Sequence, residues 1–242
     1  MPTLLFLIFA GCLIYSLLAF PFSRDARLKF YFVQTVDLDS GTNNVTLRGL
    51  DGYLQDIISD LPSARGQPLV CGDQAADIMR SGLQVCAWNG LAPNVMSTEI
   101  SALNKEDYKT WIDYNITSTN KTAQFGVQGR NTKSCRLVFD SLVSDLNIEG
   151  AASDPRYEPV SDRGSAEIRL ASRTWDKNFH MNVTWSDQEA KNQTGRIVCA
   201  WSDANQHGTI PAYDEIRRFA PVWSAVTKNA DGLVEGFRTF TV

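Results

Sequence analysis

Few residues of this sequence are suited to catalysis, because its 242 residues include only two histidines, His180 and His207. Asp203 lies four residues before His207, and a helix would place both side chains on one face, where they could bind a metal. Asn205 and the Gly-Thr pair that follows His207 favour a turn instead. We therefore expect no catalytic residue and no metal ligand in this chain. A stand-alone hydrolase that uses Asp203, His207 or Asp214 is the third of three functional hypotheses.

The common catalytic and nucleotide-binding motifs are absent from the sequence. It contains no G-x-S-x-G, no H-E-x-x-H and no G-x-x-x-x-G-K-[ST]. Its 27 acidic and 23 basic residues give a net charge of −4. Binding to a phosphate backbone needs an excess of Lys and Arg, so we expect no nucleic-acid partner.

The five cysteines indicate disulfide chemistry. Cys12 lies in an apolar N-terminal segment, and the other four cysteines allow three pairings. The sequence has no C-x-x-C, so a zinc knuckle or a thioredoxin-type site is not indicated. The favoured pairing joins Cys71 to Cys86 and Cys135 to Cys199, and such cross-links are typical of an oxidising compartment. Four buried free thiols are the alternative.

Five Asn-x-Thr sequons indicate N-glycosylation in the lumen of the secretory pathway. Apolar residues flank several of these asparagines at alternate positions, as around Asn115 and Asn182. A strand would then turn the apolar side chains inward and the asparagines to solvent. The predicted glycosylation sites are Asn44, Asn115, Asn120, Asn182 and Asn192. Accidental sequons in a cytosolic protein are the alternative.

An uncharged apolar segment, residues 3–20, precedes all charged residues of the chain. Its 18 residues are at the lower edge of the length that spans a hydrocarbon core of ~30 Å. We expect residues 1–23 to form a transmembrane helix that contacts membrane lipid through residues 3–20. The alternatives are a signal peptide cleaved after Ala19 and a lipoprotein signal at residues 9–12, FAGC, which are close to a lipobox.

The charges that flank this segment disagree with the sequons about orientation. Arg24, Arg27 and Lys29 follow the segment and no Lys or Arg precedes it, so the positive-inside rule alone places the following domain in the cytoplasm. The sequons and cysteines place it in a lumen. Both observations hold if other membrane spans fix the orientation, which suggests the C-terminal part of a larger membrane protein. A cleaved signal peptide would also remove the conflict.

Alternating apolar residues dominate residues 24–242 and predict one mainly β domain. Many short strands with two cross-links favour an antiparallel β-sandwich-like lumenal domain after the single N-terminal helix. Domain breaks near residues 97–107 or 150–163 are the alternative. Helical spacing predicts helices over residues 53–61 and 210–222, while residues 68–96 and 149–164 are expected to be rich in loops. The expected strands are residues 28–38, 44–50, 108–117, 123–128, 134–140, 166–174, 179–185, 196–202 and 237–242.

Six tryptophans support a binding function as the second hypothesis. Tryptophan rings can line a platform for sugars, but Trp185 and Trp201 fall on inward strand faces and are expected in the core. The others leave open a secreted or anchored β-sandwich that binds carbohydrate or protein.

Several segments resemble a known family. Residues 27–39 are RLKFYFVQTVDLD, residues 195–203 are GRIVCAWSD, residues 209–215 are TIPAYDE, and residues 227–235 are TKNADGLVE. Together they are similar to the C-terminal lumenal domain, with the last transmembrane helix, of the fungal vacuolar membrane proteases, a Felix-ina-related zinc metallopeptidase family. The likeness covers essentially the whole chain and is loosest over residues 65–165.

The resemblance implies an N-terminal zinc aminopeptidase-like domain, several membrane spans and then this lumenal domain. The zinc ligands and the catalytic acid of the family lie in the peptidase domain, so none of them maps onto this chain and no cofactor is expected here. The implied location is the vacuolar membrane, with the globular domain in the lumen. The first hypothesis is a membrane-anchored, non-catalytic domain that supports or gates a peptidase domain. Its expected partners are that domain or other membrane spans.

Overall fold

The computed structural model describes residues 2–73, 83–96, 105–151, 156, 160, 163–185, 190, 192–229 and 231–242. The expected loop region at residues 149–164 lies largely outside these residues. So do the alternative domain breaks near residues 97–107 and 150–163.

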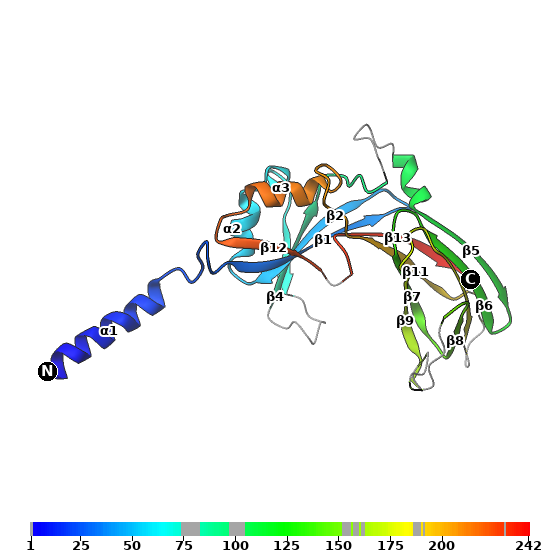
Figure 1. Ribbon diagram of the computed structural model, residues 1–242, viewed down its shortest axis with the longest axis horizontal. Coiled ribbons are helices and arrows are strands. Elements are labelled where there is room, and N and C mark those ends of the chain that lie inside the picture. Colours follow the sequence, from blue (N-terminus) through cyan, green and yellow to red (C-terminus); the bar gives the residue numbers. More distant parts are fainter. Residues whose placement is uncertain are drawn as a thin grey trace.

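The first element is helix α1, Pro2–Leu18, whose 17 residues are all exposed or only partly covered. It extends away from the rest of the chain (Figure 1). None of the helices in the described part of the chain combines the length and the apolar character that crossing a membrane requires.

The residues described above form two sheets, the larger of which has nine strands. Its strand β1, Leu28–Asp37, pairs antiparallel with β2, Asn43–Leu50, and parallel with β12, Ser224–Lys228, and β13, Val234–Thr241. The first and last strands of the domain therefore lie side by side, and the chain closes on itself. The other strands are β3 (Val70–Asp73), β4 (Leu83–Asn89), β7 (Ser134–Val143), β9 (Ser165–Ala171) and β11 (Thr194–Trp201).

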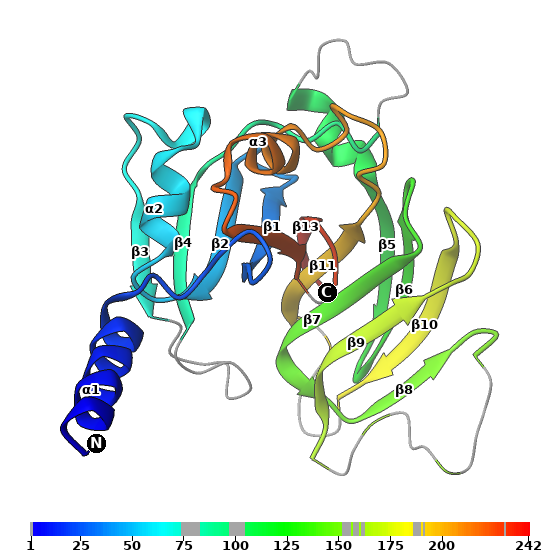
Figure 2. The same cartoon turned by 60° about the vertical axis from the view of Figure 1, so that its left-hand side comes forward.

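The smaller sheet has four antiparallel strands in the order β5-β6-β10-β8. It packs on the β13-β11-β7 part of the larger sheet through edge-to-face aromatic contacts (Figure 2). The ring of Phe125 on β6 lies 5.8 Å from that of Phe139 on β7 and 5.3 Å from that of Phe240 on β13. The mainly β, sandwich-like prediction is confirmed, and among the described residues the parallel pairs are those of β1 with β12 and β13. These strands are β5 (Ile112–Thr119), β6 (Thr122–Gly129), β8 (Asp145–Ile148) and β10 (Asn178–Thr184).

Short helices cover the other end of the larger sheet. Helix α2, Leu54–Ser59, and the 3-10 turn η1, Pro62–Ala64, lie beside helix α3, Pro211–Phe219 (Figure 1). The proline ring preorganises the first turn of α3, and the helix buries Ala212 and Ile216. Glu215 then accepts hydrogen bonds from the backbone N–H and the hydroxyl of Ser63, at 2.8 and 2.5 Å. This contact fixes α3 to η1.

Gln34 is the polar exception in the apolar row of β1, and it is fully buried. Its amide Nε2 donates to Asn43 Oδ1 at 2.6 Å and to the Leu91 carbonyl at 2.7 Å. Burying an amide group costs free energy unless it is hydrogen-bonded, and these two bonds offset that cost. The bond to the Leu91 carbonyl also ties the segment after β4 to the centre of the sheet.

Some elements differ from the sequence prediction. The predicted strand over residues 108–117 begins as a 3-10 helix, Lys105–Trp111, because Tyr108 and Trp111 turn into the core together with their rings 5.1 Å apart. The expectation of loops over residues 68–96 was wrong at β3 and β4. The strands β8 and β12 were not predicted, since each is only four or five residues long.

Candidate functional site

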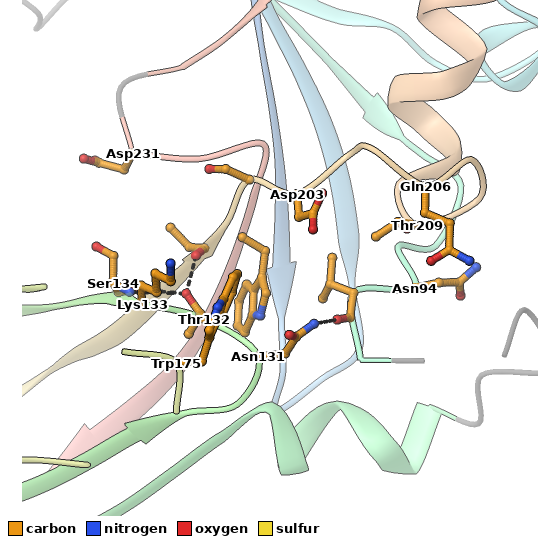
Figure 3. Close-up of a pocket in the computed structure, with 14 residues that line it drawn as sticks. Asn94, Asn131, Thr132, Lys133, Ser134, Trp175, Asp203, Gln206, Thr209 and Asp231 are labelled. Carbon is orange, nitrogen blue, oxygen red and sulfur yellow. Dashed lines mark hydrogen bonds between the residues drawn. The ribbon is translucent and has the colours of Figure 1, made fainter. Parts of the chain in front are cut away.

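A surface hollow of about 310 Å³ lies where the start of β7, the end of β11 and the following loop meet. We call it the Trp175 hollow (Figure 3). Its lining comes from segments far apart in the sequence, so the folded sheets are needed to form it. Its labelled residues are Asn94, Asn131, Thr132, Lys133, Ser134, Trp175, Asp203, Gln206, Thr209 and Asp231.

The floor of the hollow is fixed by hydrogen bonds from the turn between β6 and β7. Asn131 adopts a left-handed backbone, with φ 51°, and its side-chain Nδ2 donates to the Val95 carbonyl at 2.6 Å. The buried Thr132 hydroxyl donates to the Ala200 carbonyl at 2.5 Å. Asparagine tolerates this backbone better than most residues, so its placement here is local turn chemistry.

The rim carries an aromatic ring that is 51% exposed, that of Trp175. The Lys133 ammonium lies 4.5 Å from the ring centroid, a cation–π contact. The loop that holds the ring is anchored beside it, because Asp176 accepts at 2.5 Å from the Asn131 N–H and its carbonyl accepts at 2.9 Å from the Gln128 amide. An ordered, half-exposed indole beside a polar hollow is suited to bind a sugar face or an apolar side chain.

A charge network borders the hollow at Asp231. Arg136 bonds both Asp231 and Glu235, the latter at 2.8 Å, and Arg169 reaches Asp231 at 2.8 Å. Burial raises the pKa of Glu235, and the Arg136 guanidinium offsets this only in part. The network holds the β13 side of the hollow to β7 and β9, so it acts as a structural brace.

The structure pairs His207 with Asp214 and leaves Asp203 and His180 apart from them. Residues 202–210 form a loop, so Asp203 and His207 do not share a helical face. His207 Nδ1 lies 2.8 Å from Asp214 Oδ2, and the same oxygen accepts from the Gly208 N–H at 2.7 Å. Asp203 instead accepts from the Asn205 N–H at 3.0 Å, and His180 is exposed on β10.

No group of three His, Cys, Asp or Glu side chains that could hold a metal occurs in the described part of the chain.

The structure contains both favoured disulfides, Cys71–Cys86 and Cys135–Cys199. Each joins directly opposed residues of neighbouring antiparallel strands, β3 with β4 and β7 with β11. Cys12 is exposed on α1. The second disulfide lies close to the hollow, because Cys135 and Ser134 begin the same strand that lines it.

All five sequon asparagines have exposed side chains: Asn44, Asn115, Asn120, Asn182 and Asn192. Four of them gather on the smaller sheet and the turns next to it. Asn115 lies on β5, Asn120 in the β5–β6 turn and Asn182 on β10, while the Asn120 carbonyl accepts from the N–H of Ala190, two residues before Asn192.

The tryptophans separate into core and surface groups. Trp185 and Trp201 are buried, as the strand alternation predicted, and so are Trp88 and Trp111. The sequence pointed to Trp175 only as one of six tryptophans that could line a sugar platform, and it did not point to Lys133. The polar neighbours of Trp175, Thr174 and Asp176, favour a surface position but do not place the ring beside a hollow.

Comparison with known proteins identifies the family. Residues 28–235 match the family model described as vacuolar membrane protease, C-terminal domain. A vacuolar membrane protease of Phaeosphaeria nodorum is 47% identical over 246 residues, which cover 100% of this chain and 25% of the relative. A vacuolar membrane protease of Ajellomyces capsulatus is 43% identical over 261 residues, which cover 100% of this chain and 30% of the relative. The chain thus spans about a quarter of the length of the curated relatives it matches.

Among solved structures, the Fcho1 Mu homology domain of Danio rerio aligns with 88% of this chain at 6% identity, with a TM-score of 0.27. That score is too low to indicate a shared fold. The resemblance first seen in residues 27–39 and 195–235 is confirmed by the family match. The chain belongs to the family of the vacuolar membrane protease C-terminal domain.

Proposed function

We propose that this chain is a non-catalytic domain of the vacuolar membrane that supports or gates a zinc peptidase domain from the lumenal side. The names of its relatives support the vacuolar membrane, and five exposed sequon asparagines support the lumen. Residues 3–20 would contact lipid, because α1 is uncharged and buries none of its residues in the domain. Zinc would belong to the peptidase domain of the family.

The observation that carries the proposal is the separation of three sequon asparagines, Asn120, Asn182 and Asn192, from the Trp175 hollow. Asn178 on β10 pairs with Gln128, whose amide bonds the loop of Trp175, whereas Asn182 lies four residues further along the strand, roughly 13 Å away. Asn120 and Asn192 lie beyond the same far end of the sheet. Glycans there would shield one end of the domain and leave the hollow open to another protein surface.

The hollow also has the composition of a contact site. Its exposed indole is the kind of aromatic anchor that dominates protein interfaces, and Asn and Gln amides around it supply polar partners. The hydrogen bonds under Asn131 and Thr132 hold the site in one conformation before contact. A partner would then lose little conformational freedom on this side of the interface.

A chimera tests this role. The C-terminal quarter of the Phaeosphaeria nodorum relative is replaced by this chain, and the half-life of its peptidase activity is measured at elevated temperature. Trp175→Ala is expected to shorten the half-life several-fold, as the loss of a hot spot of at least about 2 kcal/mol allows. Leu142→Ala, which truncates an apolar side chain that is 59% exposed, is the matched control and should change nothing. Equal half-lives in both variants would contradict the proposal.

A second candidate function is carbohydrate binding at the same hollow, favoured by the half-exposed ring of Trp175 beside Asn94 and Asp203. The full chain in detergent, applied to a glycan array, distinguishes the two. Specific binding that Trp175→Ala removes, in the absence of any peptidase partner, would favour this function.

A further inference from the structure

A second hollow, of about 800 Å³, lies between the segment that follows α1 and the segment from α3 to β12, and four arginines line it. Arg24 and Arg27 come from the segment that leaves α1, and Arg217 and Arg218 come from the last turn of α3. We call it the arginine hollow. The segment after α1 reaches it because the Leu28 N–H donates to the Trp223 carbonyl at 2.9 Å and starts the pairing of β1 with β12. In Figure 1, α3 and β12 lie near the beginning of β1, at the end of the domain from which α1 extends.

Asp25 lies between Arg24 and Arg27 in the sequence and is exposed, but it pairs with none of the four guanidinium groups. In the described part of the chain, none of them forms an ion pair. The two acids of α3 are engaged elsewhere, Asp214 with His207 and Gly208, and Glu215 with Ser63. All four arginine side chains are exposed. A concentration of unneutralised arginine in a hollow favours a phosphate-type anion, which the planar guanidinium binds through two hydrogen bonds.

The arginines are held in place by neighbours that leave the charge free. Arg217 lies 6.0 Å from the ring centroid of Tyr213, and Arg218 lies 5.4 Å from that of Phe219. Arg27 Nε donates to the Arg24 carbonyl at 2.9 Å. These contacts use ring faces and a backbone oxygen, so they orient the guanidinium groups without cancelling their charge.

An aromatic cluster separates the arginines from α1. The rings of Phe20 and Trp223 lie 5.1 Å apart, those of Phe22 and Tyr53 also 5.1 Å, and Phe20 is 53% exposed. Val222, on the lip of the hollow, is 73% exposed. From α1 outward, the surface therefore passes from apolar side chains to aromatic rings to arginines. This is the order of hydrocarbon, interface and headgroups in a bilayer leaflet.

We propose that Arg24, Arg27, Arg217 and Arg218 bind the headgroup phosphates of anionic phospholipids in the leaflet next to the domain. The inference rests on the proposed insertion of α1 into the membrane. The exposed aromatic and aliphatic side chains beside the arginines favour a lipid over a free phosphate ion, because a free ion makes no use of them. The contact would hold α3 and the neighbouring strand β12 against the bilayer, and it would set the tilt of the domain relative to the membrane plane.

The test uses the full chain reconstituted in nanodiscs of phosphatidylcholine with a minor share of phosphatidylserine. Bromine atoms, which quench tryptophan fluorescence at short range, are carried on the acyl chains of one lipid or the other at equal overall composition. We expect each brominated phosphatidylserine molecule to quench the fluorescence of Trp223 more than each brominated phosphatidylcholine molecule does. This excess quenching is the measure of the preference for the serine lipid. Trp223→Phe should remove the excess quenching, which identifies the ring that reports it.

The double variant Arg217→Gln/Arg218→Gln should lower the serine-lipid preference about fivefold or more, as expected for the loss of two basic groups at an anionic surface. Arg163→Gln/Arg173→Gln changes two exposed arginines outside the hollow by the same charge and should leave the preference intact.

The proposal would be overturned by no preference in the unmodified chain, by equal loss in both double variants, or by an unchanged preference in Arg217→Gln/Arg218→Gln. Replacement of chloride by inorganic phosphate at constant ionic strength should leave the preference in place. If phosphate removes it, the hollow binds a soluble anion and the lipid assignment is wrong. Because peptidase activity is not measured, this result is independent of the chimera experiment.

Discussion

Asp39, at the tip of the first hairpin, links the two ends of the domain. It accepts from Arg238 Nε at 3.1 Å and from the Thr239 N–H at 3.0 Å, so the β1–β2 turn is held to β13. Burial pushes the pKa of Asp39 upward, but these hydrogen bonds and the arginine charge outweigh it, and the pKa lies below its ordinary value. Such a group stabilises the fold above its unfolded pKa of about 3.9, and the gain in stability is lost as the pH falls through the lower folded pKa.

Asp39→Asn should therefore lower the free energy of unfolding at neutral pH by about 1 kcal/mol, since the pair is partly exposed. The difference from the unmodified chain should shrink as the pH falls below ~3.9. Urea unfolding of the full chain in detergent at several pH values measures it, with Asp113→Asn on the exposed face of β5 as the control. A difference that stays constant across the acid range would contradict this account of Asp39.

Gly129 is required by the close approach of a disulfide. A Cβ at this position would lie 2.9 Å from both the Cys135 and Cys199 sulfurs and 2.5 Å from Thr132 Cγ2. Gly129→Ala should lower the free energy of unfolding, measured by thermal unfolding, by about 1–3 kcal/mol, because overpacking a core usually costs this much. Gly72→Ala meets no atom within 4 Å and should stay within about 0.5 kcal/mol of the unmodified chain. Equal effects of the two substitutions would show that the predicted crowding at Gly129 is absent.

Among the elements, the two cross-strand disulfides differ in the length of chain that they close. The sequence separation is 64 residues for Cys135–Cys199 and 15 for Cys71–Cys86. Replacing both cysteines of a pair by serine should cost about 4 kcal/mol for the first and ~3 kcal/mol for the second. Denaturant unfolding of the two double variants measures the order. The prediction is contradicted if removing the Cys71–Cys86 disulfide lowers the free energy of unfolding more than removing the Cys135–Cys199 disulfide between β7 and β11.

Strands with one buried face were predictable from the sequence, and the others were not. β1, β2, β6, β7, β10 and β11 alternate clearly between apolar and polar residues, and each lies within a few residues of its predicted place. β12 was missed because it has only five residues and pairs in parallel with a distant strand, which local alternation cannot reveal. β4 was missed because its side chains are mostly half-buried and its period is blurred.

At the scale of the whole molecule, the family and the disulfide pairs could be predicted, but the two hollows could not. Sequence spacing identified the sequons because a glycosylation signal is local. The Trp175 hollow joins residues from position 94 to position 231, and the arginine hollow joins residues 24 and 218. Such sites depend on sheet order and on the parallel pairing of the first and last strands, which no local pattern encodes.

The proposed function requires that the Trp175 end of the domain faces the peptidase domain, while the end of the smaller sheet near Asn120, Asn182 and Asn192 faces away. Photocrosslinking in the chimera tests it directly, with p-benzoylphenylalanine placed at Trp175 or, as the matched position on the smaller sheet, at His180. The account predicts a crosslink from position 175 into the N-terminal three quarters of the protease and none from position 180. Crosslinks from position 180 without any from position 175 would contradict it.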